Sequence, residues 1–425
     1  MISGIVSHVF FACQQKTASR QQVVRFWAMG AEGEAVQKLK PIFERQHPSI
    51  KLDIQTIPWT AAQEKLISAY ASRNLPDVFQ LGNTWIPQFA ALNTLEALNT
   101  RIDTSRSISS AAYFRGIWQT NIIDSLVYGI PWYIDTRVLF YRTDLLKQAG
   151  FTRPPRTWQA LYTMAKAIKK QSRSGQYALY LPTNEWAPFV IFGLQNGASL
   201  LKENSTRGNF ESPAFLRAFE FLIRFYHEDL APLGFTQITN VYQAFARGTF
   251  VFYISGPWNL PQFKRWMSDS LRDRWMTAPL PAPHADTIGC SLAGGSSLVL
   301  NRHSPRKQAA WTFIEFLSLA QTQVKFYELM NDLPARKAAW KDPHLKEDPY
   351  LRAFYQQLHH VKPLPKIPEW EHIAFAKIRQ YVEYAARNKM SSRQALRALD
   401  RDTDKILEKR RWLLKRQHAN SGEKP

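Results

Sequence analysis

The stretch LVYGIPWYIDTRVLFYRTDLL, residues 126–146, decides the fold that the sequence predicts. Two short runs within it, 126–128 and 138–141, consist of β-branched, aromatic and other apolar side chains that favour buried strands. Between these runs, Pro131 lacks the backbone donor that a sheet needs and restricts Ile130 to extended geometry. A continuous sheet would not tolerate this break, whereas a chain passing from one lobe to another would. The stretch therefore predicts a strand, a crossing and a second strand.

Polar residues lie inside the predicted crossing, where Asp135, Thr136 and Arg137 follow one another. Burying such groups in an apolar core without hydrogen-bond partners is unfavourable. We therefore expect these three side chains to face a cleft between two lobes, since ligand sites combine concave shape with a few polar groups.

Length and composition favour a folded protein with more than one domain. At 425 residues the chain is too long for a single compact core, so two domains, or three, are expected. Hydrophobic residues make up 45% of the chain and aromatic residues 13%, which argues against disorder. The 14 Trp and 16 Tyr residues exceed what packing alone requires, and they indicate surfaces on which a ligand could stack.

The chain is strongly basic, with 55 Lys and Arg against 34 Asp and Glu and a formal net charge of +21. This balance suits nucleic acid, an anionic membrane surface or an acidic ligand, and it equally suits a basic surface that only serves solubility. The charge is scattered, except in KILEKRRWLLKR at 405–416, where six basic residues stand against Glu408. That segment could favour an anionic surface, although basic residues at a helix C-terminus more often form a solvated face.

The segment 1–22 has the pattern of an export signal and a tether. Its apolar run at 5–12 fits the apolar part of a signal peptide and is too short to span a bilayer. A small residue before Cys13 resembles a bacterial lipoprotein processing site, so we expect lipidation at Cys13 and a polar tether over 14–22. An exported start without lipid, or an unexported start, is the alternative. The expected location is periplasmic, or on the membrane as a lipoprotein.

Strands and helices alternate at the start of the folded chain. Expected strands at 23–29, 50–54 and 77–81 are separated by helical patterns, which favours a parallel sheet flanked by helices. Ligands of such sheets lie beyond the carboxyl ends of the strands. Three loops should meet at that edge, and they are 30–33, expected as a turn, 58–59 and 82–85.

A second lobe is predicted from the middle of the chain. Expected strands at 179–181 and 250–254 accompany a helix whose apolar residues Phe215, Phe219, Leu222 and Tyr226 have the spacing of a core face. Prolines between 279 and 283 mark a return crossing, and Pro334 marks a third crossing followed by mostly helical sequence. The expected division is 23–133 plus 284–333 for the N-terminal lobe, 134–283 plus 334–417 for the C-terminal lobe, and 418–425 as a polar tail.

Pieces of the sequence resemble, in order, the family 1 extracellular solute-binding proteins, which are the sugar-binding components of ABC importers related to maltose-binding protein. The pieces are FWAMG at 26–30, FERQHPSIKLDIQTIPW at 43–59, LPDVFQLGNTWIPQFAALNTLEALN at 75–99, YGIPWYIDTRVLFYRTDLLKQAGF at 128–151, PRTWQAL at 155–161, FARGTFVFYISGPWNL at 245–260, TAPLPAP at 277–283, LAGGSSLVLNRHSPRKQAAWTFIEFL at 292–317 and LPARKAAW at 333–340. The resemblance implies an α/β periplasmic-binding-protein fold, class II-like, in which hinge crossings join two lobes around a ligand.

Sugar recognition needs aromatic faces against the C–H face of a pyranose, and carboxylates, amides or guanidinium groups against its hydroxyls. The expected cleft loops supply both. The candidate ligand-binding residues are Glu32, Trp59, Asn83, Trp85, Tyr133, Asp135, Trp186, Gly256, Trp258, Gly295, Ser296, Arg336 and Trp370, with Thr84 and Trp132 as further candidates. Trp258 stands out, because it follows an expected strand directly and matches the cleft loop of the family. Core packing is the alternative for each Trp, a local hinge contact for Asp135 and a buried ion pair between lobes for Arg336.

The sequence thus indicates a solute-binding protein that takes up a sugar, an oligosaccharide or a related polyol and delivers it to the permease subunits of an ABC importer. We expect a monomer with no catalytic residues, no cofactor, no metal site and no nucleic-acid partner. The motifs HExxH, GxSxG, GxGxxG and the phosphate loop are absent from the sequence. Three alternatives stay open: a binder of an anionic molecule such as glycerol phosphate, a carbohydrate-active enzyme, and a nucleic-acid-binding protein.

Overall fold

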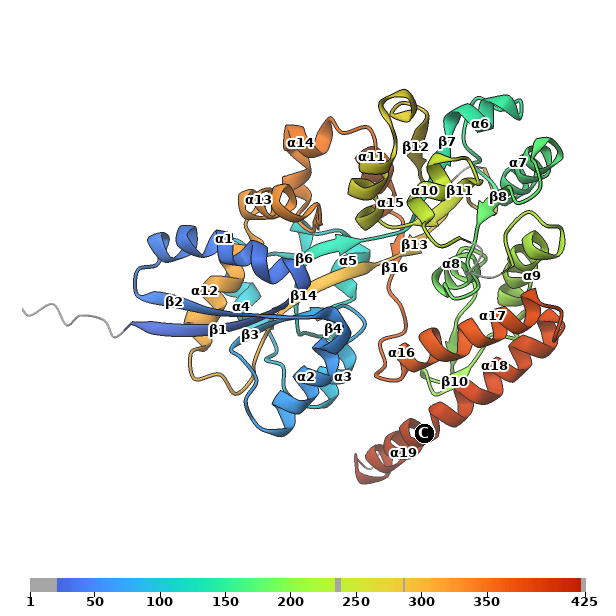
Figure 1. The fold of residues 1–425 in the computed structure, drawn as a ribbon. Coiled ribbons are helices and arrows are strands. Elements are labelled where there is room, and N and C mark those ends of the chain that lie inside the picture. Colours follow the sequence, from blue (N-terminus) through green and yellow to red (C-terminus); the bar gives the residue numbers. More distant parts are fainter. Residues whose placement is uncertain (1–20, 234–237, 286, 422–425) are drawn as a thin grey trace, which may run out of the picture.

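The structure, a computed structural model, describes residues 21–233, 238–285 and 287–421, so the predicted lipidation at Cys13 lies outside the described residues. Two sheets flanked by helices form two lobes that lie side by side (Figure 1). We call the six-stranded sheet with its helices the first lobe, and the four-stranded sheet with its helices the second lobe. The predicted two-lobe α/β fold is confirmed.

The first lobe is built on a sheet with strand order β15-β6-β14-β3-β1-β2. Its strands are β1 (Gln22–Met29), β2 (Ile50–Ile57), β3 (Val78–Gly82), β6 (Ile130–Asp135), β14 (Gly294–Leu300) and β15 (Leu333–Pro334). The first three run parallel, as predicted, while β14 is antiparallel to both β3 and β6. The parallel strands therefore end at one edge, and the chain leaves the lobe across that edge after β6 and returns across it into β14.

Helices follow the three parallel strands directly. They are α1 (Gly30–Gln46), α2 (Trp59–Ala71) and, after a short turn, α3 (Ile86–Ala91). The prediction of a turn at 30–33 was wrong, because α1 starts at Gly30 itself, whose φ of 50° lies in the region that glycine adopts without strain. A Cβ atom at Gly30 would also lie 2.9 Å from Trp59 Cδ1, so glycine lets the start of α1 approach the start of α2.

The prediction that the strand breaks at Pro131 was also wrong. Pro131 lies within β6 and pairs with Ser297 of β14, and the register shifts next to it, so that Ser296 pairs with Tyr133. On its other side β6 meets only the two residues of β15, which pair with Ile134 and Tyr133. Pro131 thus has no neighbour there that would require its missing N–H group, which explains why the strand accommodates it.

The second lobe is built on a sheet with strand order β12-β7-β11-β8. Its strands are β7 (Val138–Arg142), β8 (Tyr177–Tyr180), β11 (Phe250–Ser255) and β12 (Trp275–Ala278), and its longer helices are α7 (Trp158–Gln171), α8 (Ala187–Gln195), α9 (Pro213–His227), α15 (Leu351–Leu358), α17 (Arg379–Ala386) and α18 (Ser392–Ile406). All four residues of the predicted α9 core face, from Phe215 to Tyr226, are buried. The crossing from β6 to β7 consists of Thr136 and Arg137 alone, so it is shorter than predicted.

Two further crossings join the lobes, and they are paired with each other. The return from β12 includes β13 (Ser291–Leu292), which runs parallel to β16 (Val361–Lys362) on the segment that leads from α15 to the last helices. The backbone N–H groups of Ser291 and Ala293 donate to the carbonyls of His360 and Lys362 at 2.8 and 2.9 Å. Figure 1 labels the two strands next to each other between the lobes.

The remaining elements are short or lie at the periphery, except α12 (Lys307–Ser318), which buries most of its residues against β1, β6 and β14, and α13 (Ala320–Met330), which packs against α1. The others are α4 (Asn99–Thr104), α5 (Arg115–Gln119), β4 (Ile122–Ile123), β5 (Leu126–Val127), α6 (Thr143–Gln148), β9 (Leu201–Lys202), β10 (Arg207–Gly208), α10 (Val241–Ala246), α11 (Leu260–Trp266), α14 (Pro343–Lys346), α16 (Trp370–His372) and α19 (Glu408–Ser421), with short 3-10 turns and a π-helix, η6 (Ile373–Ile378). Of the helices in the described ranges, none combines the length and apolar content that crossing a bilayer requires.

Candidate functional site

A cavity of about 410 Å³ lies between the two lobes. Its walls come from the carboxyl ends of the parallel strands of the first lobe, from β6 and β14, and from loops and helices of the second lobe. The lining residues are Glu32, Trp59, Gly82, Asn83, Thr84, Trp85, Tyr133, Ile134, Asp135, Arg137, Trp186, Pro257, Trp258, Leu292, Ala293, Gly294, Gly295, Ser296, Asp332, Leu364, Glu371 and Phe375. The three loops expected at one edge of the sheet therefore do meet at this cavity.

Glu32 is the acceptor at the centre of the first-lobe wall. It lies in the first turn of α1, where the helix dipole favours a negative charge. Its Oε1 atom accepts hydrogen bonds from Trp59 Nε1 at 3.0 Å and from the Tyr133 hydroxyl at 2.8 Å. These bonds fix the carboxylate and the Trp59 ring relative to each other before any ligand arrives.

A buried hydrogen-bond network supports this wall from behind. Gln80 Nε2 donates to the Tyr133 hydroxyl at 3.0 Å and to Ser296 Oγ at 3.2 Å, and Ser296 Oγ donates to the same hydroxyl at 3.0 Å. Burial raises the pKa of Tyr133 well above its usual range, and the charges of Glu32 and Asp332 raise it further, so the phenol stays protonated. The network holds Tyr133 as a donor to Glu32.

Aromatic rings face the cavity from both lobes. Trp59 and Trp85 of the first lobe meet edge to face with centroids 5.8 Å apart, and Trp59 is 39% exposed. From the second lobe, Trp258 is 46% exposed, and Phe375 contacts Trp186 edge to face at 5.6 Å. Exposed aromatic faces of this kind are surfaces on which the C–H face of a sugar ring can pack.

Acidic side chains outnumber basic ones in the lining of the cavity, in contrast to the chain as a whole, which is basic. Among the described residues that line it, the carboxylates are Glu32, Asp135, Asp332 and Glu371, and Arg137 is the one arginine or lysine. Arg137 Nη1 donates to Asp135 Oδ1 at 2.9 Å, and its guanidinium lies 4.7 Å from the centre of the Trp258 ring. Arg137 therefore links the crossing to the aromatic wall of the second lobe.

Burial raises the pKa of three of these carboxyl groups, which are Asp135, Asp332 and Glu371. Burial raises the pKa of Asp332 to about 8, and the charges of Glu32 and Asp135 contribute to the rise. Burial also raises the pKa of Glu371, while a hydrogen bond with Thr84 opposes the rise. The contact between Glu371 and Thr84 joins the second lobe to the first across the cavity.

Most of the candidate residues predicted from the sequence lie together at this cavity. They are Glu32, Trp59, Asn83, Trp85, Tyr133, Asp135, Trp186, Trp258, Gly295 and Ser296, together with the further candidate Thr84. Arg137, which the sequence placed in a crossing that faces the cleft, also lines the cavity.

The other candidates lie elsewhere, each for a physical reason. Gly256 does not line the cavity, but a Cβ atom there would lie 1.9 Å from the Trp258 ring, so glycine makes room for that ring. Trp370 is fully buried and packs edge to face behind Trp186 at 6.2 Å, and Trp132 is buried in the first-lobe core. Arg336 donates to the carbonyl of Ser107, and its guanidinium lies over Tyr113.

Sequence reasoning missed three polar or aromatic residues of the cavity. Phe375 lies in the π-helix η6, and a π-helix changes which side chains share a face, so the spacing in the sequence does not reveal it. Asp332 directly precedes the two-residue strand β15, and Glu371 follows the buried Trp370. Asp332 could have been found from the sequence, because it is an acidic residue next to the expected crossing at Pro334.

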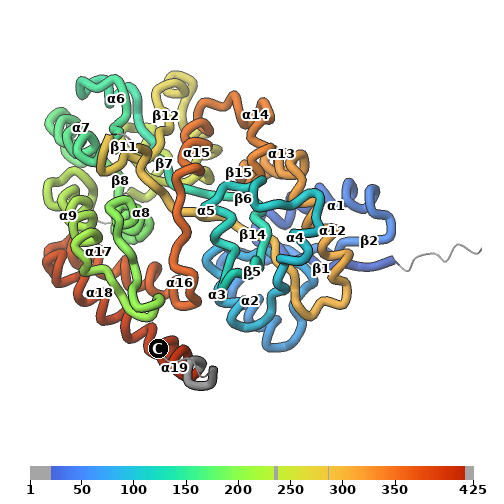
Figure 2. The backbone as a smooth tube through the Cα atoms, turned by 180° about the vertical axis from the view of Figure 1, so that it is seen from behind, coloured from blue at the N-terminus to red at the C-terminus, as the bar shows by residue number. Residues whose placement is uncertain are grey.

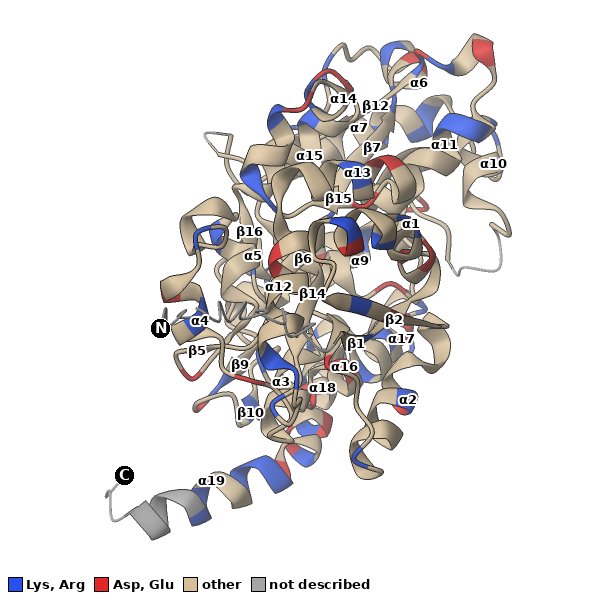
Figure 3. Ribbon diagram, turned by 90° about the vertical axis from the view of Figure 1, so that its left-hand side faces the viewer, with Lys and Arg blue, Asp and Glu red and all other residues tan. Residues whose placement is uncertain are grey.

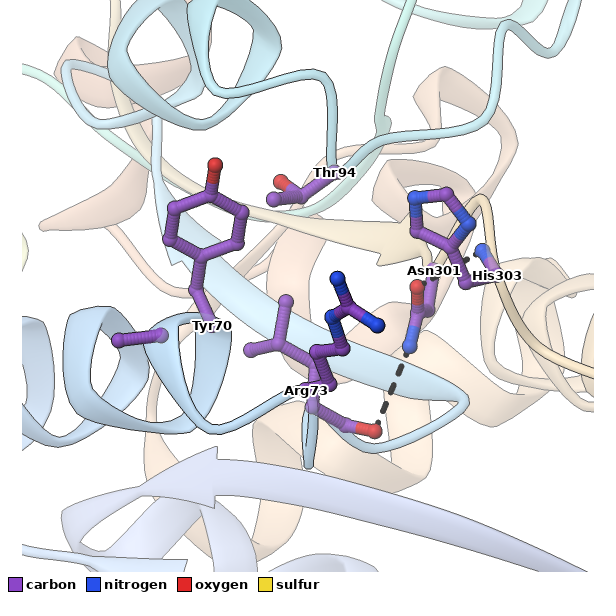
Figure 4. Close-up of a pocket in the computed structure, with 7 residues that line it drawn as sticks. Tyr70, Arg73, Thr94, Asn301 and His303 are labelled. Atoms are coloured by element: carbon purple, nitrogen blue, oxygen red, sulfur yellow. Dashed lines mark hydrogen bonds between the residues drawn. The ribbon is translucent and has the colours of Figure 1, made fainter.

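A second, larger cavity of about 570 Å³ lies wholly within the first lobe (Figure 4). Its lining residues are Tyr70, Ala71, Arg73, Leu75, Thr94, Asn301 and His303. The Asn301 amide already donates to the carbonyls of Leu75 and Pro76 at 3.3 and 3.0 Å. Among the described residues that line this cavity there is neither an acidic side chain nor a ring from the second lobe, so it differs from the cavity between the lobes.

Comparisons with known proteins concern the family of the chain and its overall fold. The family model described as bacterial extracellular solute-binding protein matches residues 38–353. The structure of the sugar-binding protein MalE from the phytopathogen Xanthomonas citri is 44% identical in sequence, with a TM-score of 0.90 over 93% of this chain and 99% of that one. Maltose-bound MalE3 of T. maritima is 25% identical, with a TM-score of 0.72 over 90% and 99% of the two chains. The diacetylchitobiose-binding protein DasA of Streptomyces coelicolor is 27% identical over 76% of this chain and 74% of its own length.

Proposed function

The chain belongs to the bacterial extracellular solute-binding protein family, and from this premise we propose that the cavity between its lobes is where a sugar is bound. The protein is the sugar- or oligosaccharide-binding component of an ABC importer. It is a binding protein and not an enzyme, so the ligand leaves the cavity chemically unchanged. The extracellular or periplasmic location follows from the family.

The facing aromatic rings carry the proposal. Trp59 and Trp85 on one side, and Trp258 and Phe375 on the other, offer stacking faces from both lobes around a single cavity of about 410 Å³. That volume lies in the range of roughly 300 to 1,000 Å³ that is usual for small-molecule sites. Glu32, held by two hydrogen bonds, is the principal acceptor for ligand hydroxyls.

The charges of the cavity favour a neutral ligand over an anionic one. Four carboxyl groups line the walls, and the single guanidinium, that of Arg137, is already paired with Asp135. An anion such as glycerol phosphate would meet those of these carboxyl groups that are ionised at short range in a partly desolvated site, where repulsion is strong. A neutral oligosaccharide instead offers hydroxyl donors that the carboxylates accept.

Closure of the two lobes around the ligand completes the proposal. A ligand that contacts both walls stabilises the arrangement in which the lobes approach, because only there does it gain both sets of contacts. We assign the first lobe, including the whole of β6 and of β15, to one moving body and the second lobe to the other. In this proposal the closed form is presented to the permease subunits of the importer, and a lipid on Cys13 would keep the protein at the membrane.

Titration with a panel of ligands tests the proposal. Maltose, longer maltooligosaccharides, diacetylchitobiose and glycerol phosphate should be compared by calorimetry and tryptophan fluorescence, at low and high salt. We expect a saccharide to bind almost independently of salt, since it carries no charge. Replacing Glu32 by Gln should weaken binding at least tenfold, whereas Glu34→Gln, at an exposed position on the same helix, should not change it. Tighter binding of glycerol phosphate than of every saccharide would contradict the proposal.

A further inference from the structure

The last helix, α19, runs on from α18 at the edge of the second lobe (Figures 1 and 2). One side of it is held by the body of the protein, because Arg411 Nη1 donates to the carbonyl of Thr206 at 2.7 Å and both Arg410 and Leu414 are half-buried. With 3.6 residues per turn, these three positions share one side of the helix. On the opposite side, the side chains that the structure describes, up to residue 416, are exposed.

The uncovered side combines apolar and basic side chains. Trp412 is 52% exposed and Leu413 is 44% exposed, and the basic side chains around them are also exposed. We call this the outward face, and it consists of Lys405 at the end of α18 with Lys409, Trp412, Leu413, Lys415 and Arg416 of α19. Glu408 is the one acidic residue within 405–416, and it lies at the start of α19 beside this face. Figure 3 shows Lys and Arg spaced along α19.

From this arrangement we propose that the outward face of α19 binds an anionic phospholipid surface. Clusters of Lys and Arg are attracted to anionic headgroups, and a Trp ring prefers the boundary between headgroups and acyl chains. Arg416 lies over the Trp412 ring at 4.6 Å, so a positive charge and an aromatic face are presented together. The helix would lie on the membrane surface, with Trp412 and Leu413 entering the headgroup region.

The side chains of the outward face fit a membrane better than nucleic acid. Binding of single-stranded nucleic acid relies on several aromatic rings on which successive bases stack, and the outward face has one ring beside an aliphatic Leu413. An apolar aliphatic side chain gains nothing from a phosphate backbone but gains from leaving water at a lipid surface. This inference concerns a surface remote from the sugar cavity and does not depend on the ligand identity.

Sedimentation with lipid vesicles tests the proposal. The purified chain should be mixed with vesicles of phosphatidylcholine alone and with vesicles of equal parts phosphatidylcholine and phosphatidylglycerol. The helix variant K405Q/K409Q/K415Q/R416Q is compared with the scattered variant K38Q/R45Q/R153Q/K346Q, which removes the same number of exposed charges from both lobes. The variant W412A/L413A keeps every charge and removes the apolar part. Sugar affinity, measured on each variant, reports whether the fold is retained.

We expect the wild-type chain to bind only the anionic vesicles. Each basic side chain near the surface strengthens binding to anionic vesicles by roughly fivefold. The affinity of the helix variant for these vesicles should therefore fall by more than about 100-fold, while that of the scattered variant should fall far less. W412A/L413A should bind several-fold more weakly and be released at lower salt. No binding of the wild-type chain to anionic vesicles would overturn the proposal, as would equal losses in the helix and scattered variants. Tighter binding to a DNA oligonucleotide than to vesicles would assign the outward face to a different partner and overturn it too.

Discussion

Replacing Asp332 by Asn should stabilise the protein in a strongly pH-dependent way. Asp332 lies in the wall of the cavity, where burial and the charges of Glu32 and Asp135 raise its pKa from 3.8 to about 8. Between these two values the unfolded chain carries an ionised Asp332, whereas the folded protein holds its proton. The unfolded state therefore binds fewer protons, and stability falls as pH rises through this window until the group ionises in the folded protein as well.

The magnitude follows from the size of the pKa rise. A rise of about four units at roughly 1.4 kcal/mol per unit gives an upper limit of about 6 kcal/mol lost between pH 4 and pH 8. Because the cavity opens to solvent, we expect about 3 to 6 kcal/mol. The Asn variant has no such titration. Its free energy of unfolding should match that of the wild-type chain near pH 4 and exceed it by that amount at pH 9.

Urea unfolding of both chains at several pH values measures this difference directly. Titrating groups that do not interact with Asp332 cancel in the comparison, so the difference reports Asp332 together with its coupling to Glu32 and Asp135. Asp53→Asn, at an exposed position on β2, serves as the control, and its free energy of unfolding should stay within about 0.5 kcal/mol of the wild-type value, as is usual for surface substitutions. A difference between Asp332→Asn and wild type that stays constant within about 0.5 kcal/mol from pH 4 to pH 9 would refute the close, desolvated placement of these three carboxyl groups.

Three other substitutions have definite expected outcomes. Gly256→Ala should weaken sugar binding at least tenfold in calorimetry, because its Cβ atom would displace the Trp258 ring, while circular dichroism stays unchanged. Arg336→Ala should leave sugar affinity unchanged and lower the free energy of unfolding by about 1 to 3 kcal/mol, since the Ser107 carbonyl loses its charged donor; a large loss of affinity would place Arg336 in the site after all. Thr157→Ala should lower stability by about 1 kcal/mol, because the Thr157 side chain accepts from Ala160 N–H at the start of α7.

The sequence was sufficient where the site depends on topology. In a parallel sheet the carboxyl ends of the strands share one edge, so the loops that carry Glu32, Trp59 and Trp85 had to meet whatever their detailed conformations. The error at 30–33, where a helix replaces the expected turn, did not matter for this reason. Trp258 was located in the same way, since it follows β11 directly.

The sequence was insufficient where the site depends on local geometry. Phe375 reaches the cavity from a π-helix, and its residue types do not distinguish that conformation from an α-helix. Trp186 and Trp370 have similar surroundings in the sequence, yet one lines the cavity and the other is buried behind it. Pro131 was read as the end of a sheet because the sequence does not show that its neighbour β15 is only two residues long.

The pairing of β13 with β16 has a mechanical consequence. Two of the connecting segments are bound to each other by backbone hydrogen bonds from Ser291 and Ala293, so neither can bend without carrying its partner along. We expect this pair of segments to act as a hinge, which resists sliding and twisting but can bend about one axis. The third connection, Thr136 with Arg137, is too short to permit a different path. In the closure that we propose, the lobes should therefore rotate about a common axis, so that the rings on the two walls reach the same relative position at each closure.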